Sequence, residues 1–285
     1  MNKKLGIIGC QSKHAEFFGS IFNIERAFPG YGVEYIFADD EPERMPYVLG
    51  NTRIPNVCRS VNELIELSDA VLITTRLAQP HYAPAMQCIK ECKPVFIDKP
   101  FTLTARDAID IEAASLEKQV LVLGGSTLCF DPLVKQFGQS TTKSKFGIIS
   151  YKADPESPYG GYHFYGSHLT DLCSVLFGMD NFLVKSVRTG DIVNTTLNTA
   201  RQMIVLHSQP DLTKPQMIFD DGDSLKTLTF DDQLCYLNGM KAFVEAIECG
   251  NPDPVRLRQL VFSVRLLDAM MQSLESGEEG YLDTL

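Results

Sequence analysis

The first residues able to do chemistry lie in a glycine-containing turn near the N-terminus. Gly9, Cys10, Gln11 and Ser12 follow a short apolar segment and precede an amphipathic one. A helix that begins after such a turn offers unpaired N–H groups and a positive dipole end, which together bind anions such as the phosphates of a dinucleotide. A full GxGxxG fingerprint would begin at Gly9, but Gln11 and His14 occupy the other two glycine positions. By itself this motif is a weak signal, and the alternative is a tight strand-to-helix turn.

An acidic pair follows the second predicted strand. A carboxylate at Asp39 or Asp40 could accept hydrogen bonds from an adenosine ribose and would repel a 2′-phosphate. This position favours NAD over NADP, although Arg44 is close enough in sequence to weaken the preference. The alternative is a pair of solvated loop acids.

Lys99 lies just beyond a central predicted strand, between Asp98 and Pro100. Ligands bind at the carboxyl ends of the strands in open α/β sheets, so this lysine is a candidate for substrate chemistry. Proline fixes its own φ and would stiffen the backbone that directs the lysine. The alternative is a solvated surface charge, which is the usual state of a lysine in a loop.

A second group of chemically able residues lies in an aromatic stretch near the middle of the chain. It contains His163, Tyr165, His168 and Asp171. Histidine suits general acid–base work, and Asp171, one helical turn after His168, could orient its ring. No metal site is predicted, because the two histidines do not share a helix face and no third strong ligand is evident. The alternative is a packed aromatic–histidine cluster.

The elements that must position these residues change character along the chain. Over residues 1–125, strands and helices alternate with short connections, which predicts a doubly wound parallel sheet. The strands are predicted at residues 5–8, 33–38, 70–74, 95–97 and 120–123, and the helices at 15–28, 82–91 and 104–117. The first domain is therefore predicted to bind a nucleotide.

Residues 126–285 predict a second domain of the α+β class, with an open, mostly antiparallel or mixed sheet. The predicted strands are 147–153, 182–188, 203–207, 216–219 and 225–230, and the predicted helices are 131–137, 169–177, 237–248 and 255–276. Strands that follow one another without helices favour this class. The last helices could pack back on the first domain.

Composition excludes several classes of function. The chain has 285 residues and a formal net charge of −10, with no basic stripe, which argues against nucleic acid and anionic membranes as partners. No apolar run reaches the roughly 18 residues of a membrane helix. Eight cysteines without a CxxC pair favour reduced thiols, and with the short N-terminal apolar run they predict a cytoplasmic protein.

Three ordered segments resemble one enzyme family. Asp98-Lys99-Pro100 ends a segment that is similar to the one closed by the Glu-Lys-Pro signature of the Gfo/Idh/MocA oxidoreductases, which include glucose–fructose oxidoreductase and inositol dehydrogenase. Gly166-x-His168-x-x-Asp171 resembles their second signature, Asp-x-Gly-x-His-x-x-Asp. Residues 243–277 are similar to their closing helices. The resemblance spans nearly the whole chain.

The resemblance implies a Rossmann domain joined to an α/β domain whose open sheet mediates contacts in a homo-oligomer, a dimer or tetramer. It implies NAD(P)-dependent hydride transfer to or from a sugar, polyol or related hydroxy compound. Lys99 matches the catalytic lysine, which hydrogen-bonds the reacting oxygen, and His168 matches the acid/base histidine. The positions that match the nicotinamide side of the cofactor site are Thr74, Thr75 and His81, and Asp98 stands where the family has a side chain that helps hold the cofactor.

The chain also departs from the family pattern. Asp98 replaces the glutamate, Phe164 stands where the second signature begins with aspartate, and Gln11 adds a Cβ to the phosphate turn. Between Phe177 and Tyr236 the chain is shorter than typical members, which predicts a reduced second sheet. These departures keep open an alternative: a non-catalytic ligand-binding or regulatory protein that retains the oxidoreductase fold.

Overall fold

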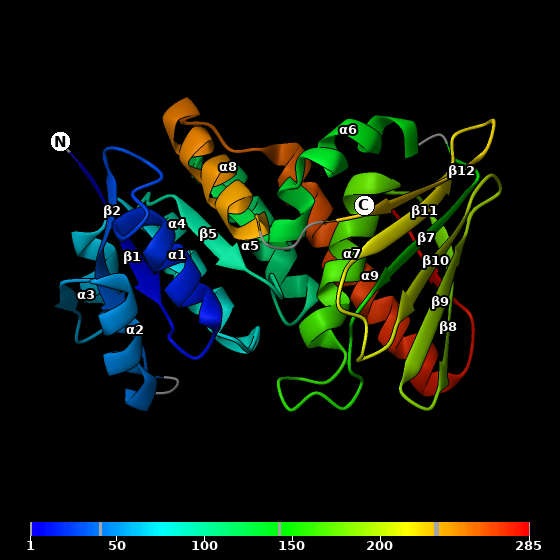
Figure 1. Cartoon of the computed structure of the whole chain (residues 1–285), viewed down its shortest axis with the longest axis horizontal. Helices are drawn as coiled ribbons and strands as arrows, with labels where there is room; N and C mark the ends of the chain where they lie inside the picture. The colour runs from blue at the N-terminus through cyan, green and yellow to red at the C-terminus, as the bar shows by residue number, and fades with distance from the viewer. Residues whose placement is uncertain (1, 40–41, 142–143, 231–233, 285) are drawn as a thin grey trace. The chain divides into compact units, whose positions relative to one another are not determined.

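The computed structural model describes residues 2–39, 42–141, 144–230 and 234–284 (Figure 1). The chain forms two compact units. The first unit consists of Met1–Thr102, Arg106–Gly124 and Tyr236–Leu257, and the second of Leu103–Ala105, Gly125–Cys235 and Arg258–Leu285. No helix in the described ranges combines the length and the apolarity that crossing a bilayer requires.

The first unit is built on a six-stranded sheet of order β3-β2-β1-β4-β5-β6. Its strands are β1 (Lys3–Ile8), β2 (Tyr31–Phe37), β3 (Asn56–Val57), β4 (Ala70–Ile73), β5 (Val95–Asp98) and β6 (Val122–Gly125). The pairs from β3 through β5 run parallel. Strands β4 and β5 are buried throughout, as expected of parallel strands covered on both faces. The predicted doubly wound sheet is confirmed, with β3 as an additional short edge strand.

Helices surround this sheet. They are α1 (Lys13–Asn23), α2 (Met45–Thr52), α3 (Val61–Leu67), α4 (Tyr82–Lys90), α5 (Ala105–Lys118) and α8 (Cys235–Cys249), with short 3-10 turns η1 (Pro42–Arg44) and η2 (Gln79–His81). The prediction that the first helix continues to residue 28 is wrong. The helix ends at Asn23, whose side-chain amide forms two hydrogen bonds with the backbone of Val33 in β2. Its Nδ2 donates to the Val33 carbonyl and its Oδ1 accepts from the Val33 N–H, at 2.8 Å each.

Aromatic contacts join α1, β5 and α8 in the core of the first unit. The ring of Phe96 on β5 meets Phe18 of α1 edge-on, with centroids 5.9 Å apart. On α8, Phe243 makes a similar contact with Phe96 at 5.7 Å. Through these buried aromatic contacts α8, which lies far along the chain, packs as part of the first unit (Figure 1).

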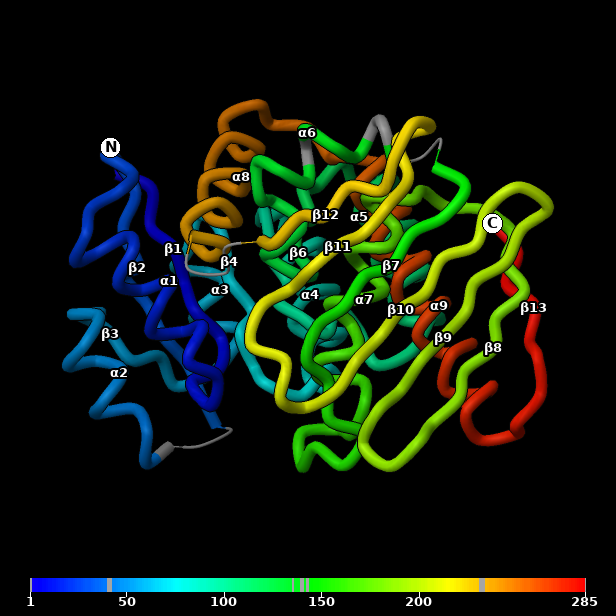
Figure 2. Tube along the Cα trace, turned by 45° about the vertical axis from the view of Figure 1, so that its right-hand side comes forward, coloured from blue at the N-terminus to red at the C-terminus, as the bar shows by residue number. Residues whose placement is uncertain are grey.

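The second unit holds a seven-stranded mixed sheet of order β12-β11-β7-β10-β9-β8-β13 (Figure 2). Its strands are β7 (Phe146–Tyr151), β8 (Phe182–Thr189), β9 (Ile192–Asn198), β10 (Met203–Ser208), β11 (Gln216–Asp220), β12 (Leu225–Thr229) and β13 (Gly280–Leu282). Only β7 and β10 pair in parallel among the pairs described. The predicted mixed sheet is confirmed, and β9 and β13 add to it.

One face of this sheet is buried and the other is open. The helices of the unit are α6 (Pro132–Thr141), α7 (His163–Leu176) and α9 (Pro254–Ser276), with a 3-10 turn η3 (Thr127–Phe130). Ser273 of α9 accepts a hydrogen bond from Ser186 of β8, and α7 lies against β7 and β10. Along the strands, buried and partly exposed residues alternate.

Helix α7 begins at His163 and not near residue 169, so the predicted start is wrong. Glycine has a low helix propensity, so Gly166 argues against a helix at this position, but the packing leaves no room for a larger residue there. A Cβ on Gly166 would lie 2.6 Å from the ring of Tyr162. That ring is buried, and its hydroxyl bonds the Ser208 hydroxyl of β10 at 2.9 Å. Packing therefore overrides local propensity.

Candidate functional site

The turn between β1 and α1 is pressed against the end of β4. Gly9 has φ +97°, and a Cβ there would lie 2.6 Å from the backbone nitrogen of Thr75. The Thr74 hydroxyl donates to the carbonyl of Gly9 at 3.0 Å and to that of Ile8 at 3.2 Å. The first fingerprint glycine is therefore required by this close approach of two strand ends.

Two arginines hold the carbonyls of the same turn. Arg44 donates from Nε to the carbonyl of Cys10 at 3.1 Å, and Arg76 donates from Nη2 to the carbonyl of Gln11 at 2.9 Å. Ser12 caps α1 by accepting a hydrogen bond from the N–H of His14 at 3.2 Å. Sequence reasoning missed Arg76, because no local pattern marks a contact across 65 residues.

This turn is suited to a dinucleotide pyrophosphate. It combines the N-terminus of α1 with cationic side chains close by. Arg44 is already engaged by Glu16 as well as by the Cys10 carbonyl. Asp39 is exposed two residues after the end of β2, the neighbour of β1, where a ribose-binding acid is expected. Asp40 lies outside the described residues.

Lys99 and Asp98 are both buried where β5 ends. Lys99 is 4% exposed and Asp98 is 1% exposed, so Lys99 is not a solvated surface charge. Burial disfavours the Asp98 carboxylate, but the charge and hydrogen bond of His14 and the charge of Lys99 outweigh it. The pKa of Asp98 therefore lies below its usual value.

His14 links Asp98 to helix α8. Its Nδ1 lies 2.5 Å from Oδ2 of Asp98, and its Nε2 lies 3.1 Å from the hydroxyl of Tyr236. The Tyr236 ring stacks on Phe17, with centroids 4.6 Å apart. The residue at the third glycine position thus makes a side-chain bridge within the first unit, which the fingerprint alone does not predict.

His81 lies beside the same strand ends, but its ring faces backbone. Its Nε2 is 2.9 Å from the carbonyl of Thr75, and its Nδ1 is 3.3 Å from the carbonyl of Phe101. The ring is fully buried, and burial lowers the pKa of His81, so the neutral imidazole is favoured. His81 therefore connects the turn after β4 to the segment after Lys99.

In the second unit, one serine connects His168 and Asp171. The Ser126 hydroxyl lies 2.7 Å from Nδ1 of His168, and the Ser126 N–H donates to Oδ2 of Asp171 at 2.7 Å. The Tyr165 ring stacks beside His168, with centroids 5.7 Å apart. Sequence reasoning missed Ser126, although its place directly after the predicted strand and Gly124-Gly125 could have indicated it.

His163 has a different set of neighbours. Its Nε2 lies 4.0 Å from a carboxylate oxygen of Asp268 on α9. Burial lowers the pKa of His163 and raises the pKa of Asp268. Asp268 also accepts a hydrogen bond from the N–H of Ala105 at 3.3 Å. The two histidines of α7 therefore serve separate contacts, and the described residues contain no cluster of three or more His, Cys, Asp or Glu that could hold a metal ion.

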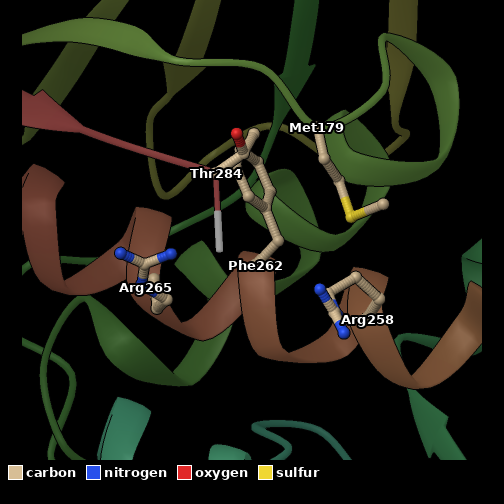
Figure 3. Close-up of a pocket in the computed structure, with 5 residues that line it drawn as sticks. All are labelled: Met179, Arg258, Phe262, Arg265 and Thr284. Atoms are coloured by element: carbon tan, nitrogen blue, oxygen red, sulfur yellow. The ribbon is translucent and has the colours of Figure 1, made fainter.

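Two cavities lie apart from the predicted residues. The cavity in the second unit has a volume of about 210 Å³ (Figure 3). It is lined by Met179, Arg258, Phe262, Arg265 and Thr284, three of which project from α9. The cavity in the first unit, about 570 Å³, lies between residues 27–31 and α8. Neither is lined by a residue that the sequence singled out.

Comparison with solved structures shows where this fold occurs. Scyllo-inositol dehydrogenase from Lactobacillus casei superposes with a TM-score of 0.84 at 11% identity, covering 98% of each chain. For myo-inositol 2-dehydrogenase from Lactobacillus plantarum, the TM-score is 0.82 at 12% identity, covering 100% of both chains. GenD2 from gentamicin A biosynthesis, solved with NAD, gives 0.82 at 14% identity, covering 99% of this chain and 97% of GenD2.

These matches show the fold, since the superpositions span at least 97% of this chain and of each of the three proteins. A search of curated proteins finds no match. Residues 3–126 match the family model described as the oxidoreductase family with an NAD-binding Rossmann fold. Over these residues the chain is similar to the Gfo/Idh/MocA oxidoreductases, in line with the resemblance of its signatures.

Proposed function

We propose that this protein is an NAD-dependent oxidoreductase that transfers a hydride between the nicotinamide and a hydroxyl-bearing carbon of a sugar, polyol or related compound. The observation that carries the proposal is Lys99, buried at the carboxyl end of β5 in an NAD-binding Rossmann fold. A lysine is rarely buried without a specific role. Two of the similar structures are inositol dehydrogenases, and a third was solved with NAD.

The cofactor is proposed to lie along the carboxyl edge of the first sheet. Residues Gly9, Cys10, Gln11 and Ser12 would face its pyrophosphate, where the α1 N-terminus favours negative charge. Asp39 would bind the adenosine ribose, which favours NAD over NADP. The residues proposed for the nicotinamide side are Thr74, Thr75 and Asp98, with His81 positioning Thr75 through its carbonyl. When bound, NAD supplies the hydride acceptor.

Lys99 and His168 are the proposed catalytic residues. The Lys99 ammonium would donate a hydrogen bond to the reacting oxygen and stabilise negative charge on it. His168 would accept the hydroxyl proton at Nε2, and Ser126 would hold the ring by accepting a hydrogen bond from Nδ1. His163, Tyr165 and Asp171 are proposed to shape substrate recognition.

The alternative is a non-catalytic ligand-binding protein with this fold. Phe164 favours it, because this side chain is only 7% exposed and packs its ring against Tyr159 and Tyr165, where the family signature has an acid. In that case NAD would bind without turnover of any sugar or polyol.

Calorimetry with NAD and NADP, followed by turnover screens with polyols and sugars, tests the proposal. We expect NAD to bind more tightly than NADP, and Lys99→Ala to lower kcat by about 10²- to 10⁴-fold. Lys90→Ala, at an exposed lysine on α4, is the matched control and should keep full activity. No NAD binding at millimolar concentration, or turnover that survives Lys99→Ala, would contradict the proposal.

We also propose that the protein is a cytoplasmic homo-oligomer, a dimer or tetramer assembled through the open face of the second sheet. Ile218, Ile148 and Val205 are register partners across β11, β7 and β10, and each is partly exposed on that face. An exposed apolar row of this kind suits contact with a second copy. None of the eight cysteines, all of which the structure describes, is in a disulfide, and six of them are buried, which fits a reducing compartment.

A further inference from the structure

His14 replaces a glycine of the fingerprint with a side chain that could carry positive charge. The ring contacts Asp98 on β5 through Nδ1 and the Tyr236 hydroxyl on α8 through Nε2. On its own helix, the ring also lies 5.9 Å from that of Phe18. These contacts place the imidazole within the first unit, facing a buried carboxylate and a phenol.

The Asp98 carboxylate needs a cation close by. It is 1% exposed, and its Oδ1 atom has no hydrogen-bond partner in the described part of the chain. A buried carboxylate is costly unless it is paired and hydrogen-bonded. Oδ2 of Asp98 lies 2.5 Å from Nδ1 of His14, so the imidazole is placed to donate a hydrogen bond to this carboxylate.

Lys99 is the other cation that acts on Asp98. It follows Asp98 directly in the chain and is itself buried, and its charge also stabilises the carboxylate. A lysine that alone neutralised Asp98 would be drawn toward it. The ammonium would then be less able to donate to a substrate oxygen.

We propose that His14 is a positioning residue for the reaction: its imidazolium takes over the neutralisation of Asp98, so that Lys99 is directed to the substrate. This inference rests on the proposed function, in which Lys99 binds the reacting oxygen. The chain thus uses a departure from the glycine fingerprint, His14, to support a departure from the Glu-Lys-Pro signature, Asp98.

The closing experiment follows the protonation of Lys99 in protein labelled with ¹³C at the lysine ε-carbon. Lys99→Arg assigns the resonance. His14→Asn keeps a neutral donor but removes the charge, so we expect the Lys99 titration midpoint to rise by about one pH unit. His14→Asn/Asp98→Asn removes both charges and should return the midpoint toward its original value. Tyr236→Phe keeps the aromatic ring at position 236 and leaves His14 in place. This variant should leave the Lys99 titration midpoint unchanged.

Kinetics with NAD and a polyol substrate complete the test. We expect His14→Asn to lower kcat about tenfold and the double variant to recover most of the loss, a rescue that a purely structural role would not produce. Circular dichroism checks folding, and His14→Gln takes the place of an unfolded His14→Asn. An unchanged Lys99 titration in the single variant, or no return in the double variant, would overturn the role of His14. A shifted titration without any turnover in the unmodified protein would overturn the proposed function instead.

Discussion

Gly9 shows how a single residue can be fixed by its surroundings. Its φ of +97° strains any other residue, and a Cβ would overlap the backbone of Thr75. We expect Gly9→Ala to lower the free energy of unfolding by about 1–3 kcal/mol, measured by urea denaturation. Gly30→Ala is the control, because Gly30 has φ +89° with nothing within 4 Å of its Cβ. If both variants lost the same free energy of unfolding, the close approach of residue 9 to Thr75 would contribute nothing to the cost of Gly9→Ala.

His81 makes stability depend on pH. Burial lowers its pKa, so the folded protein binds this proton more weakly than the unfolded chain. Stability from His81 is therefore complete above its unfolded pKa, about 6.5, and is lost as the pH falls below that value. We expect a decline of up to about 1.4 kcal/mol per pH unit between pH 6.5 and 5.5. His81→Asn should reduce this slope, and an unchanged slope would exclude His81 as its source.

Helix α3 was not predicted, although a local sequence pattern marks its start. Ser60 accepts a hydrogen bond from the N–H of Glu63 at 3.2 Å, and the Glu63 carboxylate accepts one from the N–H of Arg59 at 2.7 Å. The Ser-x-x-Glu spacing of a capping box was therefore present. Ser60→Ala should lower stability by about 0.5–2 kcal/mol in thermal unfolding, whereas Ser60→Asp should retain it. Equal thermal stability of the Ser60→Ala and Ser60→Asp variants would contradict a capping role for Ser60.

Most elements could be predicted, and the misses have physical causes. Long apolar strands such as β4 and β5 are marked by composition, because both faces are buried. Strand β9 was missed although Gly190-Asp191, between β8 and β9, is a hairpin signal. The start of α7 depends on the packing of Tyr162 against Gly166, which no local pattern contains.

For the whole molecule, the open sheet face predicts association. Val205→Glu places a charge at the centre of the exposed row on β10, next to Ile148 of β7. Burying that charge between copies would be costly, so we expect a smaller mass in sedimentation velocity with the fold intact. Leu67→Glu, at a 45% exposed position on α3 in the first unit, is the control and should keep the original mass. A monomeric unmodified protein, or an unchanged mass in Val205→Glu, would contradict the proposed interface.

The sequence by itself determined the fold class and the NAD-binding domain and indicated the family that residues 3–126 resemble, because buried strands, turns and signature motifs are local patterns. The candidate residues Lys99 and His168 also followed from motif position. Only the tertiary structure decided what surrounds them: Ser126 beside His168, Arg76 at the phosphate turn, and His14 against Asp98. Those contacts join residues 42 to 84 positions apart. Their pairing is set by how strands and helices pack, which no spacing along the chain encodes.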